Sequence, residues 1–445
     1  MQILATFSSA IHGGGSKQEG TTATMRRTTL VTAAAAALSG ALVLTACGGG
    51  GGSTGAGSDS GEVTFWDTSG PNESPAFTKI AQGCATKGGY TVKTETVAFD
   101  AALNNYKTAA QGGQGPDVFR AEVAWVPQLA KNGLVVDLTD TDLAKDTGDF
   151  LETPLGSTKF EGKSYGVPQV TDSLALFYNK KLLADAGVQP PKTWDELKAA
   201  AAKLGGEKSF FLNNDAYYAL PFIYGAGGDL VDADSKKIVV NSAANVKALQ
   251  TAKGLLDAKA ASTALDPTNS YSNMQAGFSS GEVAMVVNGP WSVADYLKGA
   301  AFTDAANLGI APVPGDTAGK GSAPVGGHDY VVRQGTKAKA SSVKFIQCMS
   351  STESQVQVAK ELGLLPTRKS AYENADVKAN PVVAAFEPVA KSAHARPWIP
   401  EGGQLFDPLK IAYADFLAGK KDAKAALDEV AKAYKDQVVP EYSIG

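Results

Sequence analysis

One stretch constrains the fold more than any other, and it runs from Gln275 to Leu297 as QAGFSSGEVAMVVNGPWSVADYL. Residues 283–287 form a continuous apolar run, which is typical of a strand covered on both faces. Asn288-Gly289-Pro290 turns the chain, and proline suits the first position of a helix. The pattern therefore predicts Trp291 in the first turn of a helix, just past the carboxyl end of a buried strand, where open α/β sheets bind ligands. A core tryptophan is the alternative.

The chain has 445 residues, which is too long for one compact core and indicates two domains. Hydrophobic residues make up 44% and charged residues 19%, as in ordinary globular proteins. The formal net charge is -4 and no basic cluster stands out, so nucleic acid is not an expected partner.

Residues 1–46 have the pattern of a secretory signal region. Met25-Arg26-Arg27 is a positive segment before an Ala-rich apolar run, and Met25 is the better start of the protein. The tetrapeptide Leu44-Thr45-Ala46-Cys47 looks like a bacterial lipobox, in which Cys47 is lipidated. Residues 47–61 then form a Gly/Ser-rich tether. We expect a lipid-anchored protein on the outer face of the cell membrane.

Short strands alternate with helices through the rest of the chain, which predicts an α/β fold with parallel βαβ units. The expected strands are 62–66, 91–97, 117–119, 173–178, 283–287, 307–311 and 330–332, and the expected helices include those that begin at Ser74 and Phe99. A hairpin is expected around residues 161–163.

The remaining cysteines, Cys84 and Cys348, each lie on the apolar face of an expected helix. Outside the cell a disulfide is permitted, and an export route favours a bridge between them. Two separate buried thiols are the alternative.

The sequence carries no nucleophile elbow, phosphate loop, dinucleotide fingerprint or HExxH motif. Beyond the signal region the histidines are His328 and His394, so a metal site is not indicated, and no cofactor is expected. Instead, aromatic residues recur beside carboxylates just after expected strands: Trp66/Asp67, Glu122/Trp125, Asp172, Asp215/Tyr217 and Trp291/Asp295. Sugars match such pairs, because their C–H faces stack on rings and their hydroxyls bond to carboxylates.

The chain resembles the solute-binding lipoproteins of bacterial ABC sugar importers, the maltose/maltodextrin-binding type of actinobacteria in particular. The resemblance covers Val63 to about Tyr434. It is carried by residues 116–133, 165–183, 191–201, 278–291 and 362–372, with FSSGEVAMVVNGPW among the most specific segments. It implies a type II periplasmic-binding-protein-like fold, with parallel-rich sheets flanked by helices in two lobes joined by a hinge. Lobe one would comprise 62–170 plus 325–350, and lobe two 171–324 plus 351–445.

The resemblance also implies a set of ligand-binding residues in the cleft between the lobes. Trp291 is the best matched, and Phe406 stands where the maltose-binding protein has a tryptophan. The full set implied by the motifs and the resemblance is Trp66, Asp67, Ser69, Arg120, Glu122, Trp125, Asp172, Asp215, Tyr217, Trp291, His328 and Phe406.

The sequence therefore predicts a monomeric receptor, not an enzyme, that closes over an oligosaccharide and delivers it to the transmembrane subunits of an ABC permease. Two alternatives stay open. One is a tethered glycosidase or lyase that uses Glu122 and Asp172 as its two carboxylates. The other is a receptor for a different sugar or another solute.

Overall fold

The computed structural model describes residues 59, 61–264 and 266–445. The predicted signal region, Met25 as the start, and Cys47 with most of its tether lie outside the described residues. None of the helices in the described part is long and apolar enough to cross a membrane.

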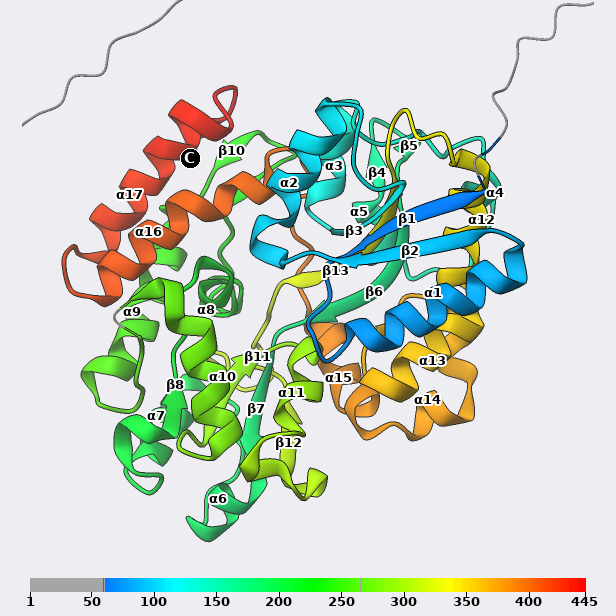
Figure 1. The fold of residues 1–445 in the computed structure, drawn as a ribbon. Coiled ribbons are helices and arrows are strands. Elements are labelled where there is room, and N and C mark those ends of the chain that lie inside the picture. Colours follow the sequence, from blue (N-terminus) through cyan, green and yellow to red (C-terminus); the bar gives the residue numbers. More distant parts are fainter. Residues whose placement is uncertain (1–58, 60, 265) are drawn as a thin grey trace, which may run out of the picture. The chain divides into compact units, whose positions relative to one another are not determined.

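Two main sheets organise residues 61–445 (Figure 1). The larger has six strands in the order β14 (Leu365–Pro366), β6 (Val167–Ser173), β13 (Val325–Val332), β3 (Val118–Glu122), β1 (Glu62–Asp67) and β2 (Thr91–Thr96). The smaller has four, in the order β12 (Leu308–Ala311), β7 (Ala175–Asn179), β11 (Met285–Asn288) and β8 (Phe210–Phe211). Minor sheets contain β9 (Val231–Asp232), β10 (Lys237–Ile238) and β15 (Ser443–Ile444), and β4 (Lys159–Phe160) with β5 (Lys163–Ser164).

Parallel pairing occurs between β1 and β2, which α1 joins, and between a few strands farther apart in the chain, β10 and β15 among them. β1 pairs parallel with β2 and with β3, and β11 pairs parallel with β8. The strands β6, β13 and β14 pair antiparallel, as do β7, β11 and β12. The expected βαβ units therefore account for one edge of the large sheet, and the strands nearest the crossings between sheets run antiparallel.

Helices cover both faces of the six-stranded sheet. One face packs against α1 (Ser74–Gly88), α12 (Lys339–Met349) and α13 (Thr352–Leu362), with Phe65 and Tyr330 among the buried residues. The other face packs against α2 (Phe99–Gln111) and α3 (Trp125–Lys131). Short helices α4 (Asp142–Lys145) and α5 (Glu152–Ser157) follow α3. Because neighbours along β1 and β3 point to opposite faces, each strand contributes to both cores.

A separate core surrounds the four-stranded sheet. Its helices are α6 (Lys180–Asp185), α7 (Trp194–Ala201), α8 (Leu220–Gly225), α9 (Ala243–Asp257), α10 (Ser270–Ser280), α11 (Val293–Tyr296), α14 (Ala375–Ala379), α15 (Pro381–Ser392), α16 (Phe406–Leu417) and α17 (Ala423–Ala433). Short 3-10 turns position the site, namely η2 (Ala216–Ala219), η4 (Pro290–Ser292) and η8 (Gly402–Leu405).

The chain passes directly from one sheet to the other at Leu174, the single residue between β6 and β7. It passes back between β12 and β13, and again after β14. Residues 365–366, which the resemblance assigned to lobe two, pair with β6 in the six-stranded sheet. The expected end of lobe one at residue 350 is therefore too early, because the hydrogen bonds of residues 365–366 with β6 place this segment in the six-stranded sheet.

Cys84 of α1 and Cys348 of α12 form a disulfide bridge, with their Cα atoms 5.7 Å apart. The bridge joins two helices on the same face of the six-stranded sheet.

Candidate ligand-binding cleft

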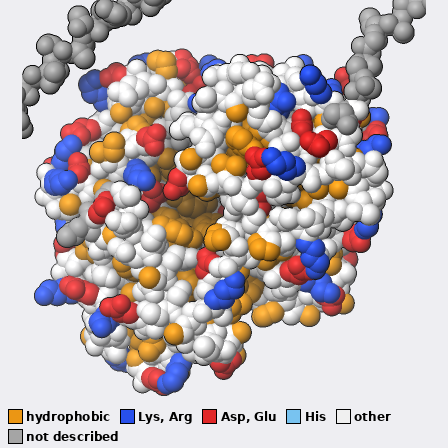
Figure 2. All heavy atoms as spheres, viewed as in Figure 1, with side chains coloured by type: hydrophobic (Ala, Val, Ile, Leu, Met, Phe, Trp, Pro, Cys, Tyr) orange, Lys and Arg blue, Asp and Glu red, His pale blue; other side chains and the backbone are white. Residues whose placement is uncertain are grey.

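Figure 2 shows a hollow in the surface, with hydrophobic side chains on its floor and acidic side chains at its edge. By comparison with Figure 1, it lies between α8 on one side and α2 and β13 on the other. Residues from both main sheets meet in this region.

Two carboxylates from the six-stranded sheet, Asp172 and Glu122, interact electrostatically with Arg396. Asp172 lies on β6 and is 9% exposed, and its carboxylate has no hydrogen bond to any residue in the described part of the chain. Burial raises the pKa of Asp172 to about 7, the charge of Glu122 adds to the shift, and Arg396 opposes it. Glu122, at the end of β3, accepts a hydrogen bond from the Ala124 backbone N–H at 2.9 Å and pairs with the Arg396 guanidinium.

Arg396 holds several parts of the cleft together. It is 6% exposed, and its Nε donates to the Val325 carbonyl at 2.9 Å. Its guanidinium also lies 5.7 Å from the ring centroid of Tyr217 and 5.9 Å from that of Phe406.

Glycine at position 326 allows Asp172 and Tyr217 to approach one another. A Cβ atom there would lie 2.2 Å from Asp172 Oδ1 and 2.7 Å from the Tyr217 hydroxyl, closer than any side chain permits. The Asp172 carboxylate and the Tyr217 hydroxyl therefore lie near each other. The Tyr217 hydroxyl, like that carboxylate, has no hydrogen bond within the described part, so both groups can still bond to a ligand.

His328 of β13 has a similar character. Both of its ring nitrogens are buried and lack a hydrogen-bond partner among the described residues. Burial holds the pKa of His328 well below its ordinary value, and the positive charges of Arg120 and Arg396 act in the same direction. The imidazole is therefore neutral, with one donor and one acceptor to offer.

Aromatic rings form a group on each side of these polar atoms. On the side of the six-stranded sheet, Phe99 is 44% exposed, with its ring centroid 5.1 Å from Trp125 and 6.0 Å from His328. On the other side, the ring of Tyr217 lies 6.5 Å from Trp291 and 6.2 Å from Phe406.

The local sequence explains how Trp291 is presented. Its ring folds back over Gly289, where a Cβ atom would come within 1.9 Å of the indole, so a side chain at 289 would displace the ring. The indole N–H donates to the Tyr271 hydroxyl at 3.2 Å. Trp291 is partly exposed at the end of β11, as the Asn-Gly-Pro-Trp pattern predicts.

Residues 79–385 match the family described as bacterial extracellular solute-binding protein. The chain belongs to this family.

Relatives in the solute-binding family carry informative names. The chain is 28% identical over 374 residues to the maltooligosaccharide ABC transporter solute-binding lipoprotein of Streptococcus pneumoniae, covering 81% of this chain and 85% of that protein. It is 29% identical over 384 residues to the diacetylchitobiose binding protein DasA of Streptomyces coelicolor, with 84% and 89% covered.

Solved structures agree with this membership. The GacH receptor of Streptomyces glaucescens, known unliganded and in complex with acarbose, is 42% identical, with a TM-score of 0.82 over 86% of this chain and 99% of that chain. The maltotriose-binding protein of Thermus thermophilus is 27% identical, with a TM-score of 0.72 and 83% and 99% covered. The fold is therefore the two-lobed, type II binding-protein fold that the sequence predicts.

Within this solute-binding fold, several predicted site residues support the cleft through other contacts. The Trp66 indole donates to Glu95 Oε2 at 2.9 Å, and its ring packs edge-on against Phe119. Asp67 is fully buried and accepts from Ser69 N at 3.0 Å and Ser69 Oγ at 2.6 Å. These groups are engaged in shaping the loop after β1.

Arg120 and Asp215 are engaged in the same way. Arg120 Nε donates to Gln169 Oε1 at 2.8 Å, and its Nη1 donates to Thr68 Oγ1 at 3.2 Å. Asp215 accepts from the Tyr217 backbone N–H at 3.0 Å and pairs with Lys410 at 3.1 Å, which fixes the start of η2.

Arg396, Phe99 and Tyr271 are not among the site residues predicted from the sequence. No local pattern in the sequence indicates that Arg396 would meet Glu122, which lies 274 positions away. Gly326-Gly327 before His328 was a usable signal, because paired glycines inside a strand indicate a close approach.

Proposed function

We propose that this chain is the extracytoplasmic binding component of an ABC transporter and captures an oligosaccharide, with a maltodextrin as the leading ligand. The observation that carries the proposal is the set of unpaired polar groups of Asp172, Tyr217 and His328 between two groups of aromatic rings. The two ring nitrogens of His328 are buried without partners among the described residues, and such atoms cost about 1–3 kcal/mol each. A ligand that offers hydroxyls and flat C–H faces satisfies both the polar atoms and the rings.

The names of relatives support the same ligand class. Maltooligosaccharide, maltotriose, diacetylchitobiose and acarbose occur in the names and titles of similar proteins, and all are oligosaccharides or resemble them. Oligosaccharides of the maltose series recur among these names, and a maltodextrin is therefore the proposed ligand.

In this proposal the two lobes close on the ligand through the crossing segments near Leu174, between β12 and β13, and after β14. Ligand contacts made only in the closed arrangement shift the population toward it. The ring faces that stack on the sugar belong to Trp125, Phe99, Tyr217, Trp291 and Phe406. The groups that bond to sugar hydroxyls belong to Glu122, Asp172 and His328. Trp66, Asp67, Ser69, Arg120 and Asp215 support these residues.

Delivery to permease transmembrane subunits by a lipid-anchored monomer completes the proposal. Lipidation at Cys47 rests on the lipobox-like tetrapeptide and on a relative named as a lipoprotein. Replacing Cys47 with serine in the producing cell and following the protein by fractionation tests this part, and retention in the membrane fraction would contradict it.

Titration calorimetry tests the binding function. Purified residues 59–445 are titrated with maltose, maltotriose, acarbose and diacetylchitobiose, and a peptide and a polyol serve as non-sugar solutes. Binding of at least one oligosaccharide, with no new products on chromatography after long incubation, is expected. Cleavage of maltotriose would overturn the receptor function in favour of a hydrolase, and binding of a non-sugar solute alone would overturn the ligand class.

A further inference from the structure

The loop after β1 contacts the helical segment that carries Trp291. The Asn72 side-chain amide donates to Asp295 Oδ1 of α11, and its carbonyl oxygen accepts from Lys298 Nζ. Asn72 follows β1 of the six-stranded sheet, whereas Asp295 follows β11 of the four-stranded sheet, and the two residues are 223 positions apart. The neutral side chain of Asn72 therefore bonds to the Asp295 carboxylate and to the Lys298 ammonium group at the same time.

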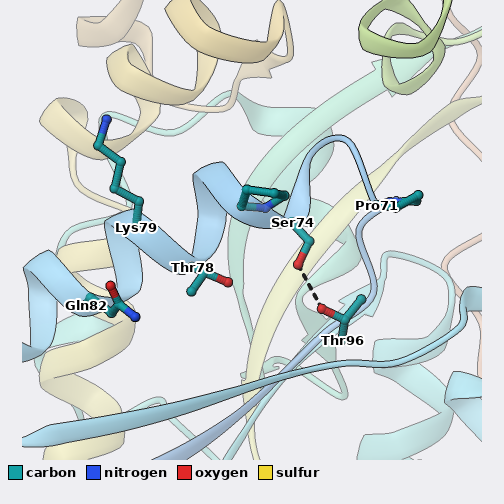
Figure 3. Close-up of a pocket in the computed structure, with 7 residues that line it drawn as sticks. Pro71, Ser74, Thr78, Lys79, Gln82 and Thr96 are labelled. Carbon is teal, nitrogen blue, oxygen red and sulfur yellow. Dashed lines mark hydrogen bonds between the residues drawn. The ribbon is translucent and has the colours of Figure 1, made fainter.

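The loop that presents Asn72, residues 68–73, is firmly held from its own side. Thr68 Oγ1 donates to the Arg120 carbonyl at 2.9 Å, and the N–H of Glu73 donates to the Gly70 carbonyl at 3.0 Å. Figure 3 shows the next anchor, the 2.8 Å hydrogen bond between the Ser74 and Thr96 hydroxyls at the start of α1. Asn72 is thus offered by a preformed loop.

The helical segment on the other side is equally fixed. η4 and α11 run without a break from Pro290 to Tyr296, and Trp291 precedes Asp295 by four residues, about one helical turn. Tyr296 is fully buried, and its hydroxyl accepts from Asn288 Nδ2 at 2.7 Å. A contact at Asp295 therefore limits the movement of Trp291 as well.

We infer that Asn72 is a positioning residue that holds the Trp291 segment against loop 68–73 and thereby slows ligand release. A sugar stacked on Trp291 leaves readily only when this segment and the loop separate, and the Asn72 contacts oppose that separation. The inference rests on the proposed function, because it assigns Trp291 to the ligand.

Stopped-flow fluorescence with maltotriose as the probe measures the effect. Asn72→Ala is expected to raise the dissociation rate constant about tenfold and to leave the association rate constant within about twofold, because hydrogen bonds to charged groups are the stronger ones. Acarbose replaces maltotriose if calorimetry finds that it binds more tightly.

A reciprocal exchange separates positioning from general damage. Asn72→Asp alone places a second carboxylate beside Asp295 and is expected to speed release. Asn72→Asp combined with Asp295→Asn lets the new amide donate to the new carboxylate, which Lys298 also pairs with, and is expected to restore slow release. Circular dichroism checks that each variant is folded.

Lys79→Ala is the matched control. Lys79 lies on α1 near the same loop and lines a hollow of about 550 Å³ with Pro71, Thr78 and Gln82, and it pairs with Glu361 instead of α11 (Figure 3). It is expected to release maltotriose at the wild-type rate.

Unchanged release from Asn72→Ala, or no recovery in the exchanged pair, would overturn the inference. If wild-type protein binds none of the oligosaccharides, the proposed function fails instead, and small-angle X-ray scattering of ligand-free protein decides the role of Asn72. A larger radius of gyration for Asn72→Ala than for Lys79→Ala supports it, and equal values refute it.

Discussion

The guanidinium of Arg396 pairs with the carboxylate of Glu122 although the two residues lie 274 positions apart. Arg396 comes from the segment between α15 and α16, whereas Glu122 ends β3 of the six-stranded sheet. The pair therefore connects the segment that leads into α16, which packs in the core around the four-stranded sheet, with the end of β3 in the six-stranded sheet.

Replacement of Arg396 by glutamine is expected to lower the free energy of unfolding by about 3–5 kcal/mol, because it leaves the Glu122 carboxylate largely buried and unpaired. Urea unfolding measures this loss. Lys181→Gln, which breaks the exposed pair with Asp185, is the control and should change stability by less than about 1 kcal/mol. A similar loss in both variants would contradict the special role of the Arg396 pair.

Trp291→Ala is expected to weaken oligosaccharide binding by about 1–3 kcal/mol through lost stacking and burial, with the fold intact. Titration calorimetry measures the loss, and Trp291→Phe should recover part of it. Unchanged affinity in the alanine variant would remove Trp291 from the site.

Ligand affinity is expected to depend on the ionisation of Asp172, whose pKa is about 7. Above that pH the carboxylate accepts strong hydrogen bonds from sugar hydroxyls, and affinity should fall as the pH drops through about 7 and the group takes up a proton. Calorimetry across this range tests the trend. In Asp172→Asn the dependence should flatten, and a wild-type profile without a slope would count against this contact.

Glu73 offers a stability prediction, because it is 5% exposed and burial raises its pKa from 4.5 to about 7, with Arg120 opposing the shift. Below about pH 4.5 the group is protonated in both states and has no effect. As the pH rises toward 7 the unfolded chain releases the proton first, so the folded protein loses stability. Glu73→Gln should therefore match the wild type near pH 4 and exceed it by about 2–3 kcal/mol near pH 8 in urea unfolding. A constant difference across this range would argue against the raised pKa.

Removal of the Cys84–Cys348 bridge by serine at both positions is expected to cost about 2–5 kcal/mol of unfolding free energy, since the bridge closes a long loop of the unfolded chain. Thermal unfolding with and without reductant tests it. Reductant should lower the wild-type midpoint toward that of the variant and leave the variant unchanged.

The sequence predicts much of the local structure, because periodicity and capping act over short distances. Strand 62–66 is observed as β1 and the expected helix at Phe99 as α2, while the expected hairpin turn at 161–163 joins β4 to β5. The strand expected at 117–119 extends to Glu122, so Arg120 and Glu122 lie on β3 and not in a following loop. Pairing with β13, distant in sequence, prolongs the strand.

The site is predicted less completely for the same physical reason. Trp291 follows from a local pattern of Asn, Gly and Pro, whereas the Arg396 and Asn72 contacts depend on how separate segments meet. Carboxylates such as Asp67 and Asp172 look equivalent in the sequence, yet one is satisfied within its loop and the other is left free. Composition cannot distinguish them, because the difference lies in the surroundings that folding supplies.

The single-residue junction at Leu174 leaves no slack between β6 and β7, and its side chain is fully buried. A rotation of one sheet relative to the other must therefore change the backbone dihedral angles of these few residues, because no flexible linker is present between β6 and β7 to absorb it. Variation in chain length should accumulate in the surface loops and spare this joint, where one inserted residue would reverse the facing of every side chain that follows on β7.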